Sequence, residues 1–148
     1  MSERVHSSSV TCPVARAIDV IGDRWSLLIL RDALDGVRRF GDFQRSLGVA
    51  KNILSDRLRR LVEAEVLVLA PASDGSPYQE YTLSSTGAQL FPVVTAIRQW
   101  GEKNLFDRGE PYTRLLDTRT GKPVPVMKPL ASDGSVLSAD NTAIRRPG

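Results

Sequence analysis

The sequence has a single cysteine, a single histidine and no long hydrophobic run, and each scarcity excludes a class of protein. Cys12 alone cannot form an internal disulfide, which favours a reducing compartment. No run approaches the roughly 18 apolar residues of a membrane span. Residues 1–10 are polar and lack the apolar core of a secretion signal. We therefore expect a cytoplasmic protein that has no membrane partner.

Signatures of catalysis are also scarce. The one histidine, His6, stands in the polar N-terminal stretch. Neither a glycine-rich phosphate loop nor a metal-ligand spacing occurs, and Ser73–Ser76 are turn residues instead of a nucleophile elbow. We therefore expect no enzymatic activity, no cofactor and no bound metal.

Basic residues, by contrast, are concentrated in one segment. The formal net charge is only +3, yet Gly36–Val62 contains seven basic and two acidic residues. A cationic surface on an otherwise near-neutral protein favours a polyanionic partner, although a solvated helix face would look the same.

Four helices are predicted before residue 65 from apolar spacing and end signals. Their expected ranges are Pro13–Ile21, Arg24–Leu34, Phe40–Leu47 and Ala50–Ala64. In the last of them, one face carries Leu54, Leu58, Leu61 and Val62, and the opposite face carries Asn52, Asp56, Arg59 and Glu63. A short helix, a turn at Gly48 and an amphipathic helix indicate a helix-turn-helix.

A β-hairpin and a long helix are predicted next. Val66–Leu69 and Tyr78–Leu83 have strand character, and Ser73–Pro77 between them has turn chemistry. A hairpin directly after a helix-turn-helix is a wing. A long helix should follow from about Ser84 to Phe106, and Pro92 should kink it or mark a new start.

The expected fold is mainly α with some β (α+β): a winged helix-turn-helix with a hairpin wing, a long C-terminal dimerisation helix and a small C-terminal β extension. Residues 1–10 are predicted to form a flexible tail, 11–106 the winged helix domain, and 107–148 the extension with a frayed end. Turns at Thr120-Gly121 and Asp133-Gly134 support β pairing in the extension.

Several stretches resemble one bacterial family. Residues 12–25 (CPVARAIDVIGDRW) are similar to the opening of HxlR-type regulators, which are MarR-like winged helix proteins. Residues 38–43 (RRFGDF), 52–61 (NILSDRLRRL) and 81–87 (YTLSSTG) match that family in the same order. The resemblance spans about residues 12–105, including the Trp100-Gly101-Glu102 sequence.

That resemblance implies a transcriptional regulator of double-stranded DNA. It further implies a homodimer formed largely by the first and last helices, with two recognition helices entering successive major grooves. The candidate interface residues are Val14, Ile18, Val94, Ile97, Trp100, Gly101 and Leu105. The effector is left open, as is the rival function of a nucleic-acid or protein-binding module without sequence-specific regulation.

The candidate DNA-binding residues lie before and within the two helices of the motif. They are Arg38, Arg39, Lys51, Asn52, Ser55, Arg57 and Arg59. Arg38 and Arg39 suit backbone phosphates, with simple solvation as the alternative. Asn52 and Arg59 can read adenine and guanine edges. Lys51 could instead contact only phosphate.

Some features depart from the family pattern or leave a role undecided. Ala50 stands where Ser or Thr usually caps the recognition helix. The hairpin has no Lys or Arg and carries Asp74 and Glu80, which makes minor-groove reading by a wing arginine doubtful. Arg57 lies nearer the packed side, so it could pair with an acidic neighbour instead of DNA.

Cys12 is a candidate redox-sensing residue. It opens the first helix, where the helix N-terminus favours a thiolate. Some HxlR-type regulators sense oxidants or electrophiles through a cysteine at this place, whereas many others with the same Cys-Pro pair do not. With one cysteine per chain, oxidation could only join two subunits or add a small group such as glutathione.

Overall fold

The computed structural model describes residues 11–148, so the predicted tail at residues 1–10, which includes His6, lies outside the described residues. The chain divides into two compact units between Val94 and Thr95. This division falls inside the last long helix, whereas the domain boundary predicted from the composition, after residue 106, stays a prediction.

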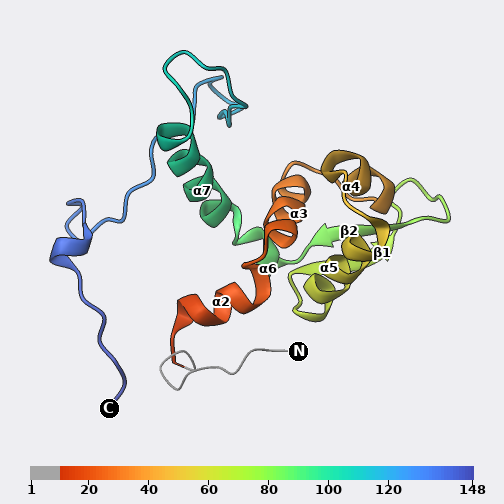
Figure 1. Ribbon diagram of the computed structural model, residues 1–148, viewed down its shortest axis with the longest axis horizontal. Helices are drawn as coiled ribbons and strands as arrows, with labels where there is room; N and C mark the ends of the chain where they lie inside the picture. The colour runs from red at the N-terminus through yellow and green to blue at the C-terminus, as the bar shows by residue number, and fades with distance from the viewer. Residues whose placement is uncertain (1–10) are drawn as a thin grey trace. The chain divides into compact units, whose positions relative to one another are not determined.

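Four helices of the first unit begin and end within one residue of their predicted positions (Figure 1). They are α2 (Pro13–Ile21), α3 (Arg24–Leu34), α4 (Phe40–Leu47) and α5 (Lys51–Glu63). Asp23 caps α3, because its carboxylate accepts the Ser26 N–H at 3.0 Å. The helix-turn-helix that the sequence predicted is confirmed as α4, the Gly48 turn and α5.

The wing is also present. Strand β1 (Leu67–Pro71) pairs with strand β2 (Gln79–Leu83) in an antiparallel hairpin, with Leu67 opposite Leu83 and Leu69 opposite Tyr81. Both strands begin one residue later than predicted. The Tyr81 N–H donates to the Arg38 carbonyl at 2.7 Å, which attaches the wing to the segment before α4.

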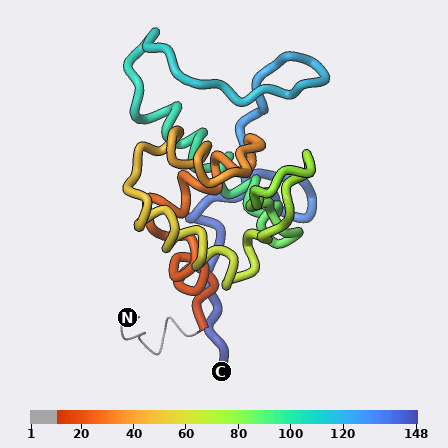
Figure 2. Tube along the Cα trace, turned by 90° about the vertical axis from the view of Figure 1, so that its right-hand side faces the viewer, coloured from red at the N-terminus to blue at the C-terminus, as the bar shows by residue number. Residues whose placement is uncertain are grey.

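The hydrophobic core of the first unit lies among α3, α4, α5 and the start of β1, whose traces run side by side in both views (Figures 1 and 2). Its fully buried side chains are Ile29, Leu30, Phe43, Leu54, Leu58, Leu61 and Leu67. Burial of each such side chain contributes about 1.5–3 kcal/mol. The predicted leucine face of α5 is therefore the face that holds the helix in the domain.

The predicted long helix is two helices, α6 (Ser85–Ala88) and α7 (Phe91–Asn104). Gly87 packs so closely that a Cβ there would lie 2.1 Å from the Val66 carbonyl oxygen. The Ser84 hydroxyl donates to the Glu65 carbonyl at 2.6 Å and accepts the Gly87 N–H at 2.9 Å. These contacts fix α6 against the start of the wing. Pro92 therefore marks a new helix start, one of the two outcomes expected of it.

The second unit contains most of α7 and the extension. Between residues 105 and 148, all of which are described, β pairing is limited to two isolated bridges, Leu116 with Pro123 and Leu130 with Val136. Prolines at 123, 125 and 129 lack the N–H groups that a longer ladder needs. The end predicted to fray contains a short 3₁₀ helix, Ala139–Asn141, capped by Ser138.

In residues 11–148, no helix is both long and apolar enough to cross a membrane.

Candidate nucleic-acid interface

A tight turn sets the angle between the two helices of the motif. Gly48 adopts a left-handed conformation with φ of 64°, which glycine accepts at low cost. Its N–H donates to the Gln44 carbonyl at 2.8 Å, and the Gln44 side-chain amide donates to the Val49 carbonyl at 3.4 Å. The turn is therefore fixed by backbone geometry and by one side chain of α4.

Helix α5 has one buried and one exposed face. Leu54, Leu58 and Leu61 have no exposed surface. The predicted groove-facing residues, Lys51, Asn52, Ser55 and Arg59, are all exposed. Ala50 forms no side-chain hydrogen bond to the start of the helix, so the first N–H groups remain for solvent or an anion. The structure thus brings four of the seven candidates onto one accessible surface.

An acidic residue, Asp56, organises the arginines of α5. Its carboxylate accepts from Arg57 at 2.6 Å and Arg59 at 2.7 Å, and Arg60 Nε lies 3.1 Å away. The hydrogen bond from Arg59 and the charge of Arg60 lower the pKa of Asp56. Arg59 also donates to Glu63 at 2.8 Å. In this structure Arg59 is therefore held by two carboxylates.

Arg57 pairs with an acidic residue of another helix. Its Nε donates at 3.0 Å to Asp23, the residue that caps α3, and its side chain is only 24% exposed. Burial raises the pKa of Asp23, but the hydrogen bonds from Ser26 and Arg57 outweigh it and leave the pKa lowered. Of the two roles open to Arg57, the structure shows the ion pair, which ties α5 to α3.

Arg39, which precedes α4, is held by the wing. Its guanidinium lies 2.5 Å from the Asp74 carboxylate, 3.6 Å from that of Glu80, and over the Tyr78 ring at 5.3 Å from the centroid. Arg38 is more exposed and reaches Glu80 only at 3.9 Å. The two acidic residues of the wing are therefore partners of the arginines that were predicted to contact phosphate.

Both wing carboxylates are themselves fixed. The Ser76 N–H and hydroxyl, together with Arg39, lower the pKa of Asp74 to about 2, so it is anionic at any neutral pH. Glu80 is buried and accepts the Ser73 N–H at 3.3 Å. The wing thus presents a neutralised surface beside α4, with no cation of its own.

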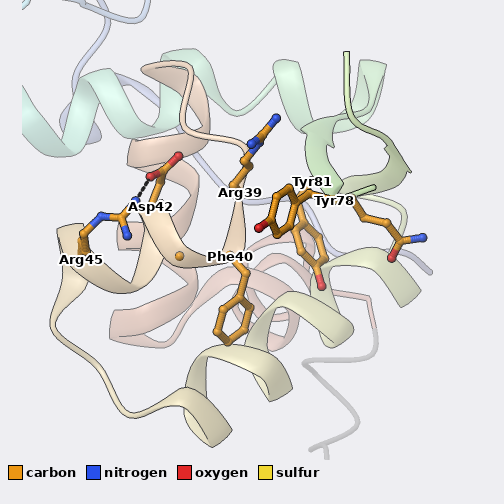
Figure 3. Close-up of a pocket in the computed structure, with 8 residues that line it drawn as sticks. Arg39, Phe40, Asp42, Arg45, Tyr78 and Tyr81 are labelled. Atoms are coloured by element: carbon orange, nitrogen blue, oxygen red, sulfur yellow. Dashed lines mark hydrogen bonds and ion pairs between the residues drawn. The ribbon is translucent and has the colours of Figure 1, made fainter. Parts of the chain in front are cut away.

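A hollow of about 630 Å³ opens between the start of α4 and strand β2. Figure 3 shows Arg45 bonded to Asp42 on one side and Tyr78 and Tyr81 on the other. The lining residues are Arg39, Phe40, Gly41, Asp42, Arg45, Tyr78, Gln79 and Tyr81. Its cations are paired, so an anion that enters would have to displace a carboxylate.

Sequence reasoning offered an acidic partner for Arg57 but missed those of Arg39, Arg59 and Arg60. Asp56 precedes Arg59 by three residues and Arg60 by four, a helical spacing that could have revealed those pairs. Asp74 and Glu80 gave no such signal, because they reach Arg39 only once the hairpin has formed.

The candidates for dimerisation and redox sensing lie apart from this surface in sequence. On α2, Val14 and Ile18 are exposed, and in the described residues 13–21 none is buried. On α7, Ile97 and Trp100 are exposed. Leu105 is exposed, and Val94 and Gly101 are half-buried. Cys12 is half-buried at the N-terminus of α2, and its Sγ accepts the Ala15 N–H at 3.4 Å.

No group of three potential metal ligands occurs among residues 11–148. The turn, the exposed face of α5 and the hairpin define a winged helix-turn-helix protein of the type found in transcriptional regulators. The chain belongs to the HxlR-like helix-turn-helix family, whose model matches residues 20–108.

Relatives and solved structures agree with that assignment. PA1607, a proposed transcription factor, is 54% identical, with 93% of this chain and 96% of its own covered and a TM-score of 0.88. The redox regulator HypR, in its reduced form, is 31% identical, with coverage of 63% and 93% and a TM-score of 0.58.

The uncharacterized HTH-type transcriptional regulator Rv3095 of Mycobacterium tuberculosis is 45% identical over 92 residues, which are 62% of this chain and 58% of that protein. The match therefore covers less than two thirds of that relative. This chain therefore carries the helix-turn-helix domain of a family whose similar members are named transcriptional regulators.

Proposed function

We propose that the protein is a homodimeric regulator that binds a specific sequence of double-stranded DNA. The observation that carries this proposal is the exposed face of α5, where Asn52, Ser55 and Arg59 stand opposite a fully buried leucine face. Side chains of these types have the donors and acceptors that distinguish base pairs in the major groove.

The ion pairs of Arg59 do not oppose this role. Asp56 and Glu63 hold Arg59 in an exposed position, where water screens both pairs and neither contributes much to stability. A bidentate contact to guanine discriminates by about 1–3 kcal/mol. On binding, Arg59 can therefore leave these carboxylates for a base edge at little cost in free energy. Before binding, the carboxylates hold its guanidinium in a fixed orientation.

Backbone phosphates are proposed to bind around the start of α4. Arg38 is half-exposed, and Arg39 stands beside it, held by Asp74. Because the wing contributes carboxylates and no cation, we infer that helices α4 and α5 supply most of the affinity for DNA. The carboxylates of the wing partly neutralise Arg39 and so weaken its attraction to phosphate.

The test is selection of bound sequences from a random DNA pool, followed by titration of the selected site and a scrambled site at two salt concentrations. A sequence-specific regulator should prefer the selected site by at least about 10³-fold. Binding that depends steeply on salt, with no preferred sequence, would favour the rival module without specific regulation.

The homodimer is proposed to use α2 and α7. Both helices expose apolar side chains, among them Ile18 and Ile97. Ile97→Asp should place an unpaired charge in the interface and shift the protein toward monomer in light scattering. A wild-type protein that is already monomeric at micromolar concentration would contradict the homodimer itself.

A second candidate function is redox control through Cys12, which two observations favour. The thiol lies at the N-terminus of α2, a helix proposed for the dimer, and the chain is similar to the redox regulator HypR. Two Cys12 thiols of a dimer would give up two electrons and two protons to an oxidant and form one intersubunit disulfide.

The test compares wild type with Cys12→Ser before and after treatment with diamide. We expect equal DNA binding by the two reduced proteins, and a loss of binding on oxidation only in the wild type. An identical response of both proteins to diamide would eliminate redox control by this residue.

A further inference from the structure

The second unit has apolar side chains but no core of its own. In residues 95–148, all of which are described, the only buried residue is Thr95. Large apolar side chains stand exposed instead, among them Trp100 at 62% and Val126 at 70%. Ordering a chain costs conformational entropy that burial must offset, and in this unit by itself nothing apolar is buried to do so.

Hydrogen bonds from two residues of α7 hold the extension to that helix. The Gln99 side-chain amide donates to the Pro125 carbonyl at 3.0 Å and accepts the Met127 N–H at 2.8 Å. On the preceding residue of the helix, Arg98 donates to the carbonyl and hydroxyl of Thr113 at 2.9 and 3.0 Å. Gln99 thus pairs with the backbone on both sides of Val126, as a neighbouring strand would.

This clamp gathers exposed apolar side chains around one hollow. Met127 and Val126 lie with Trp100 and Tyr112 around a space of about 650 Å³, whose lining also includes the polar residues Gln99, Glu102, Lys103 and Asn104. Ile97 on α7 and Leu105 just after it are also exposed. Exposed apolar side chains gathered in this way on a folded protein mark an interaction site.

We propose that the extension belongs to the dimer interface: a second copy of this chain covers the surface formed by Trp100, Val126 and Met127. The proposal rests on the homodimer proposed above and extends its interface from α7 onto Tyr112, Val126 and Met127.

Three observations favour a second copy as the occupant. The surface is a permanent feature of an otherwise coreless unit, so it needs a partner present at all times. It is continuous with α7, the helix already proposed for dimerisation. Each chain also has α2, on which Val14 and Ile18 are exposed, so a twofold pairing offers apolar helices from both copies.

The likeness to PA1607 covers 93% of this chain and so includes most of the extension, whereas the likeness to HypR covers 63%. The extension is thus a folded feature that recurs in one solved structure of similar sequence, not a peculiarity of this chain.

The first test measures the dimer dissociation constant by sedimentation equilibrium. Val126→Asp should disturb the chain itself little, because the residue is 70% exposed, but it places a charge in the proposed interface. We expect dissociation to become at least about 30-fold easier, the size of an interface hot spot. Ser132→Asp, at another exposed position of the extension, is the matched control and should change dissociation less than about twofold.

The outcomes separate this proposal from the homodimer itself. A wild-type dimer that Ile97→Asp weakens and Val126→Asp leaves unchanged would overturn the extension's role, and would assign the surface to a different protein or a small apolar molecule. A monomeric wild type would contradict the homodimer and this proposal together.

A second test seeks the contact directly. In a Cys12→Ser background, a benzophenone maleimide is attached to Val126→Cys or, as control, to Ser132→Cys, and the proteins are irradiated. Covalent dimers should form from the first and not the second. Equal yields from both positions, or none from Val126→Cys, would contradict the proposed contact.

Gln99 is a positioning residue in this account. Gln99→Ala should release residues 125–127, increase proteolysis of the extension and weaken the dimer, while the circular dichroism of the helices stays unchanged. An unchanged dimer with a released extension would show that the extension takes no part in the interface.

Discussion

The two units of this chain are stabilised in different ways. The first is built around seven fully buried side chains contributed by α3, α4, α5 and β1. The second has a single buried residue, Thr95, and is held by hydrogen bonds from Arg98 and Gln99 to the backbone of the extension. The first unit is therefore stabilised by its own core, whereas the second unit, in the dimer proposed above, would depend on a surface that another chain covers.

The largest expected effect comes from removing one apolar side chain in each unit and comparing the loss of stability. Leu58→Ala leaves a cavity in the core and should lower the free energy of unfolding by about 2–5 kcal/mol, whatever the protein concentration. Leu105→Ala removes an exposed side chain, so any loss of stability should appear only through the dimer and grow as the protein is diluted. Urea denaturation at several protein concentrations measures both.

Equal, concentration-independent losses in the two variants would contradict the difference between the units. They would mean that the second unit has a core of its own.

The contribution of the wing is tested by Asp74. Asp74→Asn releases Arg39 from its closest carboxylate, and Asp74→Lys adds a cation as well, so binding to DNA should tighten in the order wild type, Asn, Lys. Each added phosphate contact should steepen the logarithmic salt dependence by about 0.9. Arg39→Ala should weaken binding to all sequences alike. Electrophoretic titration at two salt concentrations checks all three variants.

If Asp74→Lys binds no more tightly than wild type, Arg39 and the wing tip lie away from the DNA backbone. The phosphate contacts would then have to be sought at Arg38 and Lys51.

The smallest expected effect concerns Arg57, which sequence reasoning left between two roles. A double-mutant cycle with Asp23→Ala and Arg57→Ala should give a coupling of about 0.2–1 kcal/mol in unfolding, as for other partly exposed pairs. Arg57→Ala should keep the sequence preference for DNA. A lost preference with no coupling would make Arg57 a DNA-reading residue after all.

The same pair should depend on pH in a defined direction. The pKa of Asp23 is lowered in the folded state below its ordinary value of 3.8, so the folded state stabilises the charged carboxylate. Its contribution is present above that pH and is lost as the pH falls through the lower, folded value. Denaturation between pH 2 and 6 should therefore show the coupling disappear only at the acid end.

Much of the first unit could be predicted from local signals in the sequence. The Asp23 cap, the Gly48 turn and the leucine spacing of α5 each act within a few residues, and the structure confirms the elements that they predicted. The break between α6 and α7 was one of two expectations at Pro92. Its second cause, the packing of Gly87 against Val66, depends on a contact across the hairpin.

Long-range partners could not be predicted in this way. Asp74 and Glu80 are far from Arg39 in sequence, and only the fold of the hairpin brings them together. In the extension, glycine turns at 121 and 134 were predicted, but the prolines between them limit pairing to single bridges. The hydrogen bonds between Gln99 and residues 125 and 127 take the place of β-strand pairing. No periodic pattern in the sequence predicts them.

The central claim is that the exposed face of α5 reads base sequence, and a pair of neighbouring arginines tests it most directly. Arg59 and Arg60 both pair with Asp56, are similarly exposed and point away from the buried leucines, but only Arg59 falls within the arc of α5 that carries Lys51, Asn52 and Ser55. The measurement is the ratio of affinities for a selected site and for scrambled DNA. Arg59→Ala should reduce that ratio by about 1–3 kcal/mol, and Arg60→Ala should leave it unchanged. A ratio that survives Arg59→Ala, or falls equally in both variants, would contradict the account.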